Sequence, residues 1–299
     1  MNTKSHKLIL IFAFLFFFGN SPVYADDLQD GLDAYKRKDY KTAFEKWKPL
    51  AEQGFANAQY NLGVMYATGE GVPQDYKEAV KWFRLSAEQG TAKAQAFLGA
   101  MYANGEGVTQ DDKEAAKWYR LSAEQGEASA QYNLGVMYAN GLGVTLDLKE
   151  AVKWYRLSAE QGYAKAQYDL GYMYANGRGV TQDYKEAVKW YRLSAEQGFA
   201  NAQYNLGVMY GNGEGVTQDY KEAVKWYRLA AEQGYASAQF ALGVMYAIGR
   251  GVPQDYVSAH MWSNLAGSNG IKDAIKSRDE LEKIMTQQQI EKAQEMARN

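Results

Sequence analysis

The chain contains no cysteine and almost no histidine. Without cysteine it can form no disulfide, no zinc–thiolate site and no cysteine nucleophile. One of its two histidines, His6, lies in the first 25 residues, so His260 is the single histidine of the remaining chain. His260 has no second histidine at the spacing of a zinc site. We therefore expect no metal, no cofactor and no thiol chemistry.

Neither sign of charge is in excess. The chain has 33 Lys and Arg against 35 Asp and Glu, and its formal net charge of −2 falls to −4 when Lys4 and Lys7 are removed with the first 25 residues. Nucleic-acid-binding proteins normally have a basic excess, so we expect no nucleic-acid partner. No apolar run after residue 25 is long enough to cross a bilayer, and we expect no membrane-spanning segment.

The first 25 residues have the pattern of a secretory signal peptide. Lys4 and Lys7 precede an unbroken apolar run from Leu8 to Phe18, and Val23 and Ala25 occupy the −3 and −1 places of a cleavage site. An uncleaved N-terminal anchor is the alternative, and a lipoprotein is excluded because no cysteine follows the site. We expect cleavage after Ala25 and export to the periplasm or beyond.

From residue 55 onward the sequence repeats itself with a fixed period of 36 residues, without insertion or deletion. A period of this size is typical of a solenoid, in which each unit buries its apolar face against its neighbours. The organisation predicted from it is a signal peptide at 1–25, an N-terminal capping helix pair at 26–54, six repeats at 55–90, 91–126, 127–162, 163–198, 199–234 and 235–270, and C-terminal capping helices at 271–299.

Each repeat is predicted to form two antiparallel helices, here called helix A and helix B. In the first repeat the apolar spacing predicts helix A from about Ala56 to Ala67, and Gly69 then allows a positive φ in the connection. Asp75 begins helix B, with Glu78 completing a pattern like a capping box. Gly63, a glycine inside helix A, is expected to let helix B approach closely at Ala79.

The two ends of the chain are expected to cap the solenoid. In the N-terminal pair Pro49 falls inside the second helix and should kink or loosen it. At the other end we expect one helix over Ile271–Met285, then a capping box at Thr286 and Gln289 that starts a final helix.

The repeat resembles the Sel1-like repeat family, relatives of the tetratricopeptide repeat. The motif A-x-A-Q-Y-x-L-G-x-M-Y-x-x-G-x-G-V-x-x-D-Y-x-x-A-x-x-W-Y carries the resemblance and covers residues 55–270. It implies an all-α, right-handed α/α solenoid, in a family composed mostly of adaptors and scaffolds. Secreted bacterial members are implicated in host-cell contact and cell-wall homeostasis. Some cysteine-rich members have been described as β-lactamases, but the cysteine pair of their repeats is missing here.

The sequence offers no catalytic constellation. His260 replaces a valine or alanine of the other repeats and is expected to face the core as a structural residue. After residue 25 no Ser-x-x-Lys, Ser-Asp-Asn or Lys-Thr-Gly is present, as a serine β-lactamase would require. Glycine pairs such as Gly105 and Gly107 follow a helix and lack Gly-Lys-Ser/Thr, so they are interpreted as turn glycines and not as a phosphate loop. We expect no catalytic residue and no enzymatic activity.

Two surfaces are candidates for binding. On helix B, Lys77, Lys81, Arg84 and Glu88 share a face that recurs in repeats two to five. An anionic partner could use this basic ladder, but a solvated face with Arg84–Glu88 pairs explains it as well.

The second surface, the helix A face, lies opposite the core stripe and lines the concave side by similarity to the family. It is where the copies differ most, and its asparagines could donate and accept hydrogen bonds along an extended peptide. The alternative is that its aromatic residues only fill space between repeats. The candidate partner-binding residues are Tyr60, Asn61, Phe97, Tyr132, Asn133, Tyr168, Asp169, Tyr172, Tyr204 and Asn205.

The function predicted from these observations is that of an exported, monomeric scaffold that holds a protein or peptide partner along the concave helix A face. A binder of cell-wall glycan or peptide fragments is the second hypothesis, and a hydrolase of the β-lactamase type is the third. The sequence does not name the partner.

Overall fold

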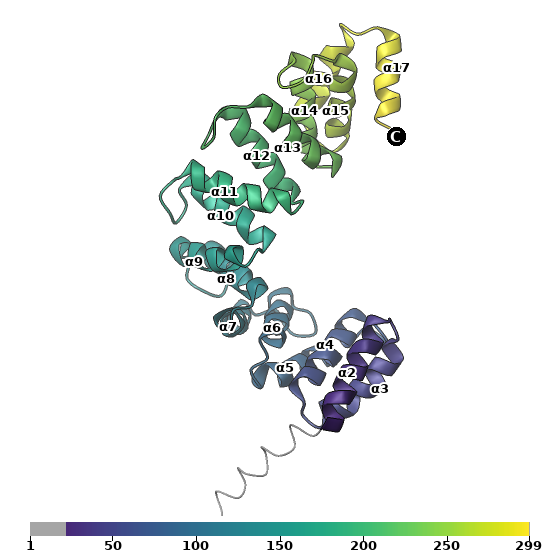
Figure 1. The fold of residues 1–299 in the computed structure, drawn as a ribbon, viewed down its shortest axis with the longest axis vertical. Coiled ribbons are helices and arrows are strands. Elements are labelled where there is room, and N and C mark those ends of the chain that lie inside the picture. Colours follow the sequence, from purple (N-terminus) through teal and green to yellow (C-terminus); the bar gives the residue numbers. More distant parts are fainter. Residues whose placement is uncertain (1–21, 299) are drawn as a thin grey trace, which may run out of the picture. The chain divides into compact units, whose positions relative to one another are not determined.

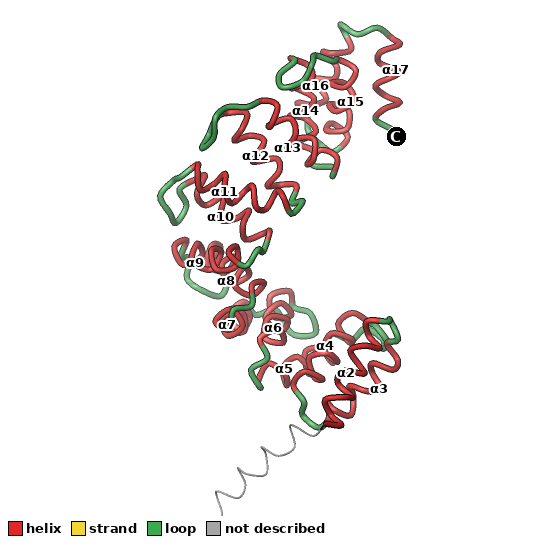
Figure 2. The backbone as a smooth tube through the Cα atoms, viewed as in Figure 1, coloured by secondary structure: helices red, strands yellow, loops and turns green. Residues whose placement is uncertain are grey.

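The computed structural model describes residues 22–298. Over this range the chain forms sixteen helices and no strand (Figures 1 and 2), which confirms the all-α repeat architecture. The helices fall into two compact units, Met1–Leu146 and Asp147–Asn299. No helix in the described part of the chain is both long and apolar enough to cross a membrane. The apolar run Leu8–Phe18 of the predicted signal peptide lies outside the described residues.

The first unit holds the N-terminal helix pair and the helices up to the middle of the third repeat. Each helix packs against the next along the chain. The helices are α2 (Pro22–Lys36), α3 (Tyr40–Glu52), α4 (Ala56–Thr68), α5 (Tyr76–Glu88), α6 (Ala92–Asn104), α7 (Asp112–Glu124) and α8 (Ala128–Asn140).

The second unit continues the same alternation and ends in two further helices, both of which contact α15. The helices are α9 (Leu148–Glu160), α10 (Ala164–Asn176), α11 (Tyr184–Glu196), α12 (Ala200–Asn212), α13 (Tyr220–Glu232), α14 (Ala236–Ile248), α15 (Tyr256–Ser268), α16 (Lys272–Glu282) and α17 (Gln287–Met296). Across both units, helix A of the successive repeats is α4, α6, α8, α10, α12 and α14.

The predicted helix boundaries are confirmed by their caps. In the first repeat Gly69 ends α4 in the left-handed conformation, at φ 77°, and its N–H donates to the Met65 carbonyl. The Asp75 carboxylate accepts from the backbone N–H groups of Lys77 and Glu78 at the start of α5. These contacts satisfy backbone groups that a helix end leaves unpaired.

Gly63 makes room for an aromatic ring of helix B. A Cβ at this position would lie 2.5 Å from the Phe83 ring, so the prediction of a close helix contact is confirmed, but its nearest partner is this ring and not Ala79. In the fifth and sixth repeats the carbonyl of the residue equivalent to Ala79 is also close, 3.2 Å from a Cβ at Gly207 or Gly243.

Glutamine side chains of successive repeats are hydrogen-bonded to one another, and the sequence pattern did not predict this pairing. Gln59 is 4% exposed and donates to the Ala51 carbonyl at 3.1 Å, while Gln89 donates to the Gln59 side-chain oxygen at 2.7 Å. The same pairing links Gln125 to Gln95, and Gln197 to Gln167. A buried amide with both ends paired stabilises the stacking of consecutive helices instead of costing free energy.

One carboxylate of the first repeat contacts both helices of the N-terminal pair, near their ends. Glu70 accepts hydrogen bonds from the hydroxyls of Tyr35 and Tyr40. Next to them the Trp47 ring, 5.6 Å from that of Tyr35, is almost completely buried. Helix α3 continues through Pro49 to Glu52, so the proline does not end it.

We expect the N-terminal pair to loosen in acid because of Glu70. The hydroxyls of Tyr35 and Tyr40 lower the Glu70 pKa below its ordinary value of 4.5. A lowered folded pKa means that the stabilisation is complete above the ordinary value and is lost as pH falls through the folded value. Tryptophan fluorescence should therefore change in acid before the rest of the chain unfolds, and a Trp47→Phe variant, which keeps the other six tryptophans, should lack this early change. In a Glu70→Gln variant this early step should be absent, and an unchanged acid profile would contradict the assignment.

Helices α16 and α17 both contact α15 of the last repeat. Helix α16 ends at Glu282, three residues before the predicted end, and the capping box of Thr286 and Gln289 starts α17. His260 faces the core, fully buried, and its Nε2 lies 2.8 Å from the Glu282 carboxylate.

Candidate functional site

The polar residues predicted to bind a partner are half-buried in the helix A face and are not free in solvent. Asn61, Asn133, Asp169 and Asn205 all have this intermediate exposure. Part of each side chain is therefore accessible to solvent and part is covered. The Asn205 side chain lies near tyrosines of two neighbouring helices, so it belongs to the packing of the face as well as to its surface.

In the second unit the asparagines approach tyrosine hydroxyls. The amides of Asn201 and Asn205 lie near the Tyr168 hydroxyl, and the Asn205 amide also lies near that of Tyr191 on α11. Burial raises the pKa of Tyr168 above its usual value, and the two amides offset part of this increase. Asn205 thus connects helix A of one repeat to helix B of the repeat before it.

Aromatic rings back the helix A face in both units. In the second unit the Tyr168 ring lies 5.8 Å from that of Tyr191, and the Tyr204 ring lies 5.8 Å from that of Tyr227. The residue just before the next helix A packs against each of the two helix A tyrosines, Tyr168 and Tyr204. The Phe199 ring is 5.2 Å from Tyr168, and the Tyr235 ring is 5.3 Å from Tyr204.

In the first unit the corresponding rings form a cluster of three. The centroid of Phe97 lies 5.1 Å from that of Phe83 in a stacked arrangement and 5.9 Å from that of Tyr60. Phe97 is 43% exposed, and in the second unit Tyr172 is 38% exposed. Tyr132, on α8, is half-buried. The structure thus brings Tyr60 and Phe97 together, and it brings Tyr168 together with Asn205.

Two kinds of contributing residue escaped the sequence analysis. One is the helix B ring under the face, and the other is the residue just before each helix A. The sequence did contain a signal for the residue just before each helix A, because this residue varies inside otherwise similar repeats. It is Phe55, Thr91, Glu127, Tyr163, Phe199 and Tyr235 in the six copies. Its contact with the aromatic residue of the preceding helix A cannot be inferred from spacing along one helix.

The basic ladder of helix B is largely occupied by contacts within the chain. Lys81 pairs with Glu78 at 3.0 Å. The Arg84 guanidinium donates to the Tyr102 hydroxyl at 2.5 Å and lies over its ring, so the expected Arg84–Glu88 pair does not form. The same arginine–tyrosine contact recurs at Arg120 and Tyr138. This face is therefore better explained as a structural contact between repeats.

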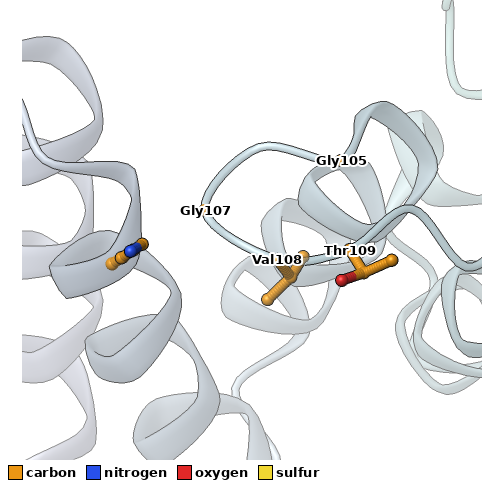
Figure 3. Close-up of a pocket in the computed structure, with 5 residues that line it drawn as sticks. Gly105, Gly107, Val108 and Thr109 are labelled. Atoms are coloured by element: carbon orange, nitrogen blue, oxygen red, sulfur yellow. The ribbon is translucent and has the colours of Figure 1, made fainter.

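Two shallow hollows of about 510 Å³ lie beside the glycine loops. Figure 3 shows the first, lined by Gly105, Gly107, Val108, Thr109 and Lys77. A Cβ at Gly107 would lie 2.2 Å from the Tyr76 carbonyl oxygen, so this glycine permits contact between successive repeats. The backbone amides of Lys77 and Glu78 at the start of α5 are already bonded to the Asp75 carboxylate. The interpretation as turn glycines is confirmed.

Among the described residues no three His, Cys, Asp or Glu side chains are placed to hold a metal ion. His260 contacts Glu282 inside the C-terminal cap, away from the helix A face. Along the helix A face, aromatic rings, amides and single charges are spaced on successive helices.

The Sel1 repeat family model matches the chain six times, at residues 56–91, 92–127, 128–163, 164–199, 200–235 and 236–271. The chain belongs to the Sel1 repeat family. Each match begins one residue after the predicted repeat boundary. Sel1 repeat proteins are typically scaffolds for protein–protein interaction.

Two solved Sel1 repeat structures are similar to the chain. A Sel1 repeat protein from Oxalobacter formigenes has 35% identity and a TM-score of 0.72, over 81% of this chain and 96% of that one. A protective antigen of uropathogenic Escherichia coli strains has 34% identity and a TM-score of 0.69, over 92% of this chain and 68% of that one. A comparison with curated proteins gave no match.

Proposed function

We propose that this protein is an exported, non-enzymatic scaffold that holds an extended segment of a partner protein along the helix A face. The proposal rests on the positions at which the six copies of helix A differ from one another. Helix A keeps its core residues Ala, Gln, Leu, Gly, Met and Tyr in all six copies, while the residues of its outward face change from copy to copy. A surface that served packing alone would not require this variation.

The chemistry of the face suits an extended peptide. Half-buried asparagines offer both donors and acceptors to a peptide backbone. Phe97 and Tyr172 remain more than a third exposed, and aromatic anchors of this kind contribute strongly to protein interfaces. Asparagine amides and exposed aromatic rings could also contact a sugar ring, so the experiment has to distinguish binding of cell-wall fragments from binding of a peptide.

The test is binding by a variant of the second unit. Affinity capture with the full chain, followed by mass spectrometry, identifies a partner, and the affinity for it is then measured. Asp169, Tyr172 and Asn205, all on the helix A face, are changed together to alanine. We expect binding to weaken at least about tenfold, because unpaired buried polar groups on the partner each cost about 1–3 kcal/mol. Circular dichroism should show unchanged helix content.

The control changes a different face of the same unit. Lys185 and Lys221, on α11 and α13, are exposed. Changing both to glutamine should leave the affinity within about twofold, because isolated surface charges contribute little. If this control abolishes binding while the alanine variant binds normally, helix B is the recognition surface. Binding of purified cell-wall fragments without any peptide partner would favour the second hypothesis, and hydrolysis of a chromogenic cephalosporin would favour the third.

The proposed export rests on the N-terminal pattern of charge, apolar run and small residues. The E. coli structural neighbour is described as a protective antigen. We expect mass analysis of protein purified from a bacterial host to show Asp26 as the first residue, and the protein to leave the cytoplasm. Recovery of an intact Met1 would contradict export.

A further inference from the structure

The second repeat carries its aromatic residue one position later than the other repeats. Four copies of helix A have a tyrosine followed by Asn or Asp, as in Tyr168-Asp169 and Tyr204-Asn205. The second repeat has Ala96-Phe97 in these places. One step along a helix turns a side chain by about 100°. The ring therefore leaves the tyrosine position and takes the position of the asparagine, where Phe97 is 43% exposed.

The surroundings of Phe97 are aromatic. In the second unit Asn205 approaches the hydroxyl of Tyr191, and the residues equivalent to this pair in the first unit are Phe97 and Phe83. Neither ring carries a polar group, and the two stack with an interplanar angle of 14°. With Tyr60 they form a platform of three rings, of which Phe97 is 43% exposed.

A carboxylate stands beside this platform where the second unit has a ring. Phe199 packs on Tyr168, and the residues equivalent to that pair are Glu127 and Ala96. The Glu127 carboxylate lies close enough to Tyr60 to add to the rise in its pKa that burial causes. Its hydrogen-bond partner is the Ser129 hydroxyl at 3.3 Å, and in the described part of the chain no Lys or Arg lies within 4.0 Å of it.

We propose that Tyr60, Phe97 and Glu127 bind a basic side chain, arginine in preference to lysine, in an extended segment of the partner protein. This inference rests on the proposed function and names the chemistry of its ligand. A cation is attracted to the face of an aromatic ring, and the planar guanidinium group also stacks on it. A neutral apolar side chain would bury the Glu127 carboxylate without a cation to pair with its charge, which is costly, and an acidic side chain would be repelled.

The experiment selects peptides and then changes both sides of the contact. The full chain and its Glu127→Gln variant are each used to select from a phage library of random dodecapeptides. We expect the wild-type chain to enrich arginine and the variant to lose this enrichment. For a selected peptide, Glu127→Gln should weaken binding about fivefold, because an exposed ion pair and a cation–π contact each contribute up to about 1 kcal/mol. Phe97→Ala should weaken it similarly.

Two controls make the result specific. Glu124→Gln removes the same charge from an exposed position on α7 and should leave the affinity unchanged. Replacing the arginine of the peptide by glutamine should weaken binding to the wild-type chain, with no further loss for the Glu127→Gln variant, because the two changes remove the same contact.

The outcomes separate this inference from the proposed function. If selected peptides lose binding to the Asp169, Tyr172 and Asn205 variant but carry no arginine or lysine and ignore Glu127→Gln, the basic-residue inference is overturned and the proposed function stands. If the wild-type chain selects no peptide, both are overturned.

Discussion

A Gly215→Ala variant is expected to lose much of the stability of the second unit. Gly215 lies in the loop between α12 and α13 at φ 71°, and a Cβ there would lie 2.3 Å from the Tyr184 carbonyl oxygen at the start of α11. The left-handed conformation alone costs a non-glycine residue about 1–2 kcal/mol, and overpacking adds about 1–3 kcal/mol, for a total of about 2–5 kcal/mol. Urea unfolding followed by circular dichroism measures the loss.

Gly234 provides a matched control in the same unit. It also has a positive φ, of 84°, but a Cβ there would have no neighbour within 4 Å. Gly234→Ala should therefore lose only the conformational part, about 1–2 kcal/mol. Equal losses in the two variants would contradict a close contact between the Gly215 loop and helix α11. A larger loss at Gly215 would show that this loop fixes the distance between successive repeats.

The fixed repeat period and the helix-capping residues made the fold predictable. Gly69, Asp75 and their equivalents act through the backbone within a few residues, so their effect can be inferred from local sequence. Multiplied over six copies, these signals located both helices of every repeat. Pro49 lies inside helix α3, as predicted, and the helix ends three residues later at Glu52. The C-terminal capping box of Thr286 and Gln289 was likewise local and was predicted correctly.

The candidate site was only partly predictable, because its contacts join residues of different repeats. Tyr60 and Phe97 could be placed on the helix A face from periodicity alone. That Phe83 stacks on Phe97, and that Glu127 lies beside Tyr60, depends on how three successive repeats are stacked. The same reason explains why the contacts of Asn205 were not predicted, since its amide approaches hydroxyls of two earlier helices. A helical stripe predicts which side chains share a face and does not predict which neighbours cover them.

A Gly207→Leu variant is expected to destabilise the second unit and to disturb the helix A face. A Cβ at Gly207 would lie 2.6 Å from the Tyr227 ring, which packs on Tyr204. The larger side chain must push this ring or separate α12 from α13, and overpacking of a well-packed contact costs about 1–3 kcal/mol, occasionally more. Because Tyr204 rests on the displaced ring, affinity for a partner that contacts this part of the face should fall as well.

Gly211, one turn later in α12, is the control that isolates the contact. A Cβ there would lie 3.6 Å from the Tyr227 hydroxyl, an ordinary contact distance, and the other five repeats have alanine at this place. Gly211→Ala should raise the free energy of unfolding by up to about 1 kcal/mol, because alanine is the better helix former. Gly207→Ala gains the same helix propensity but still meets the ring, so it should be less stable than Gly211→Ala. If both alanine variants gain equally in urea unfolding, the Tyr227 ring does not rest on Gly207, and the explanation given for the helix A glycines is wrong.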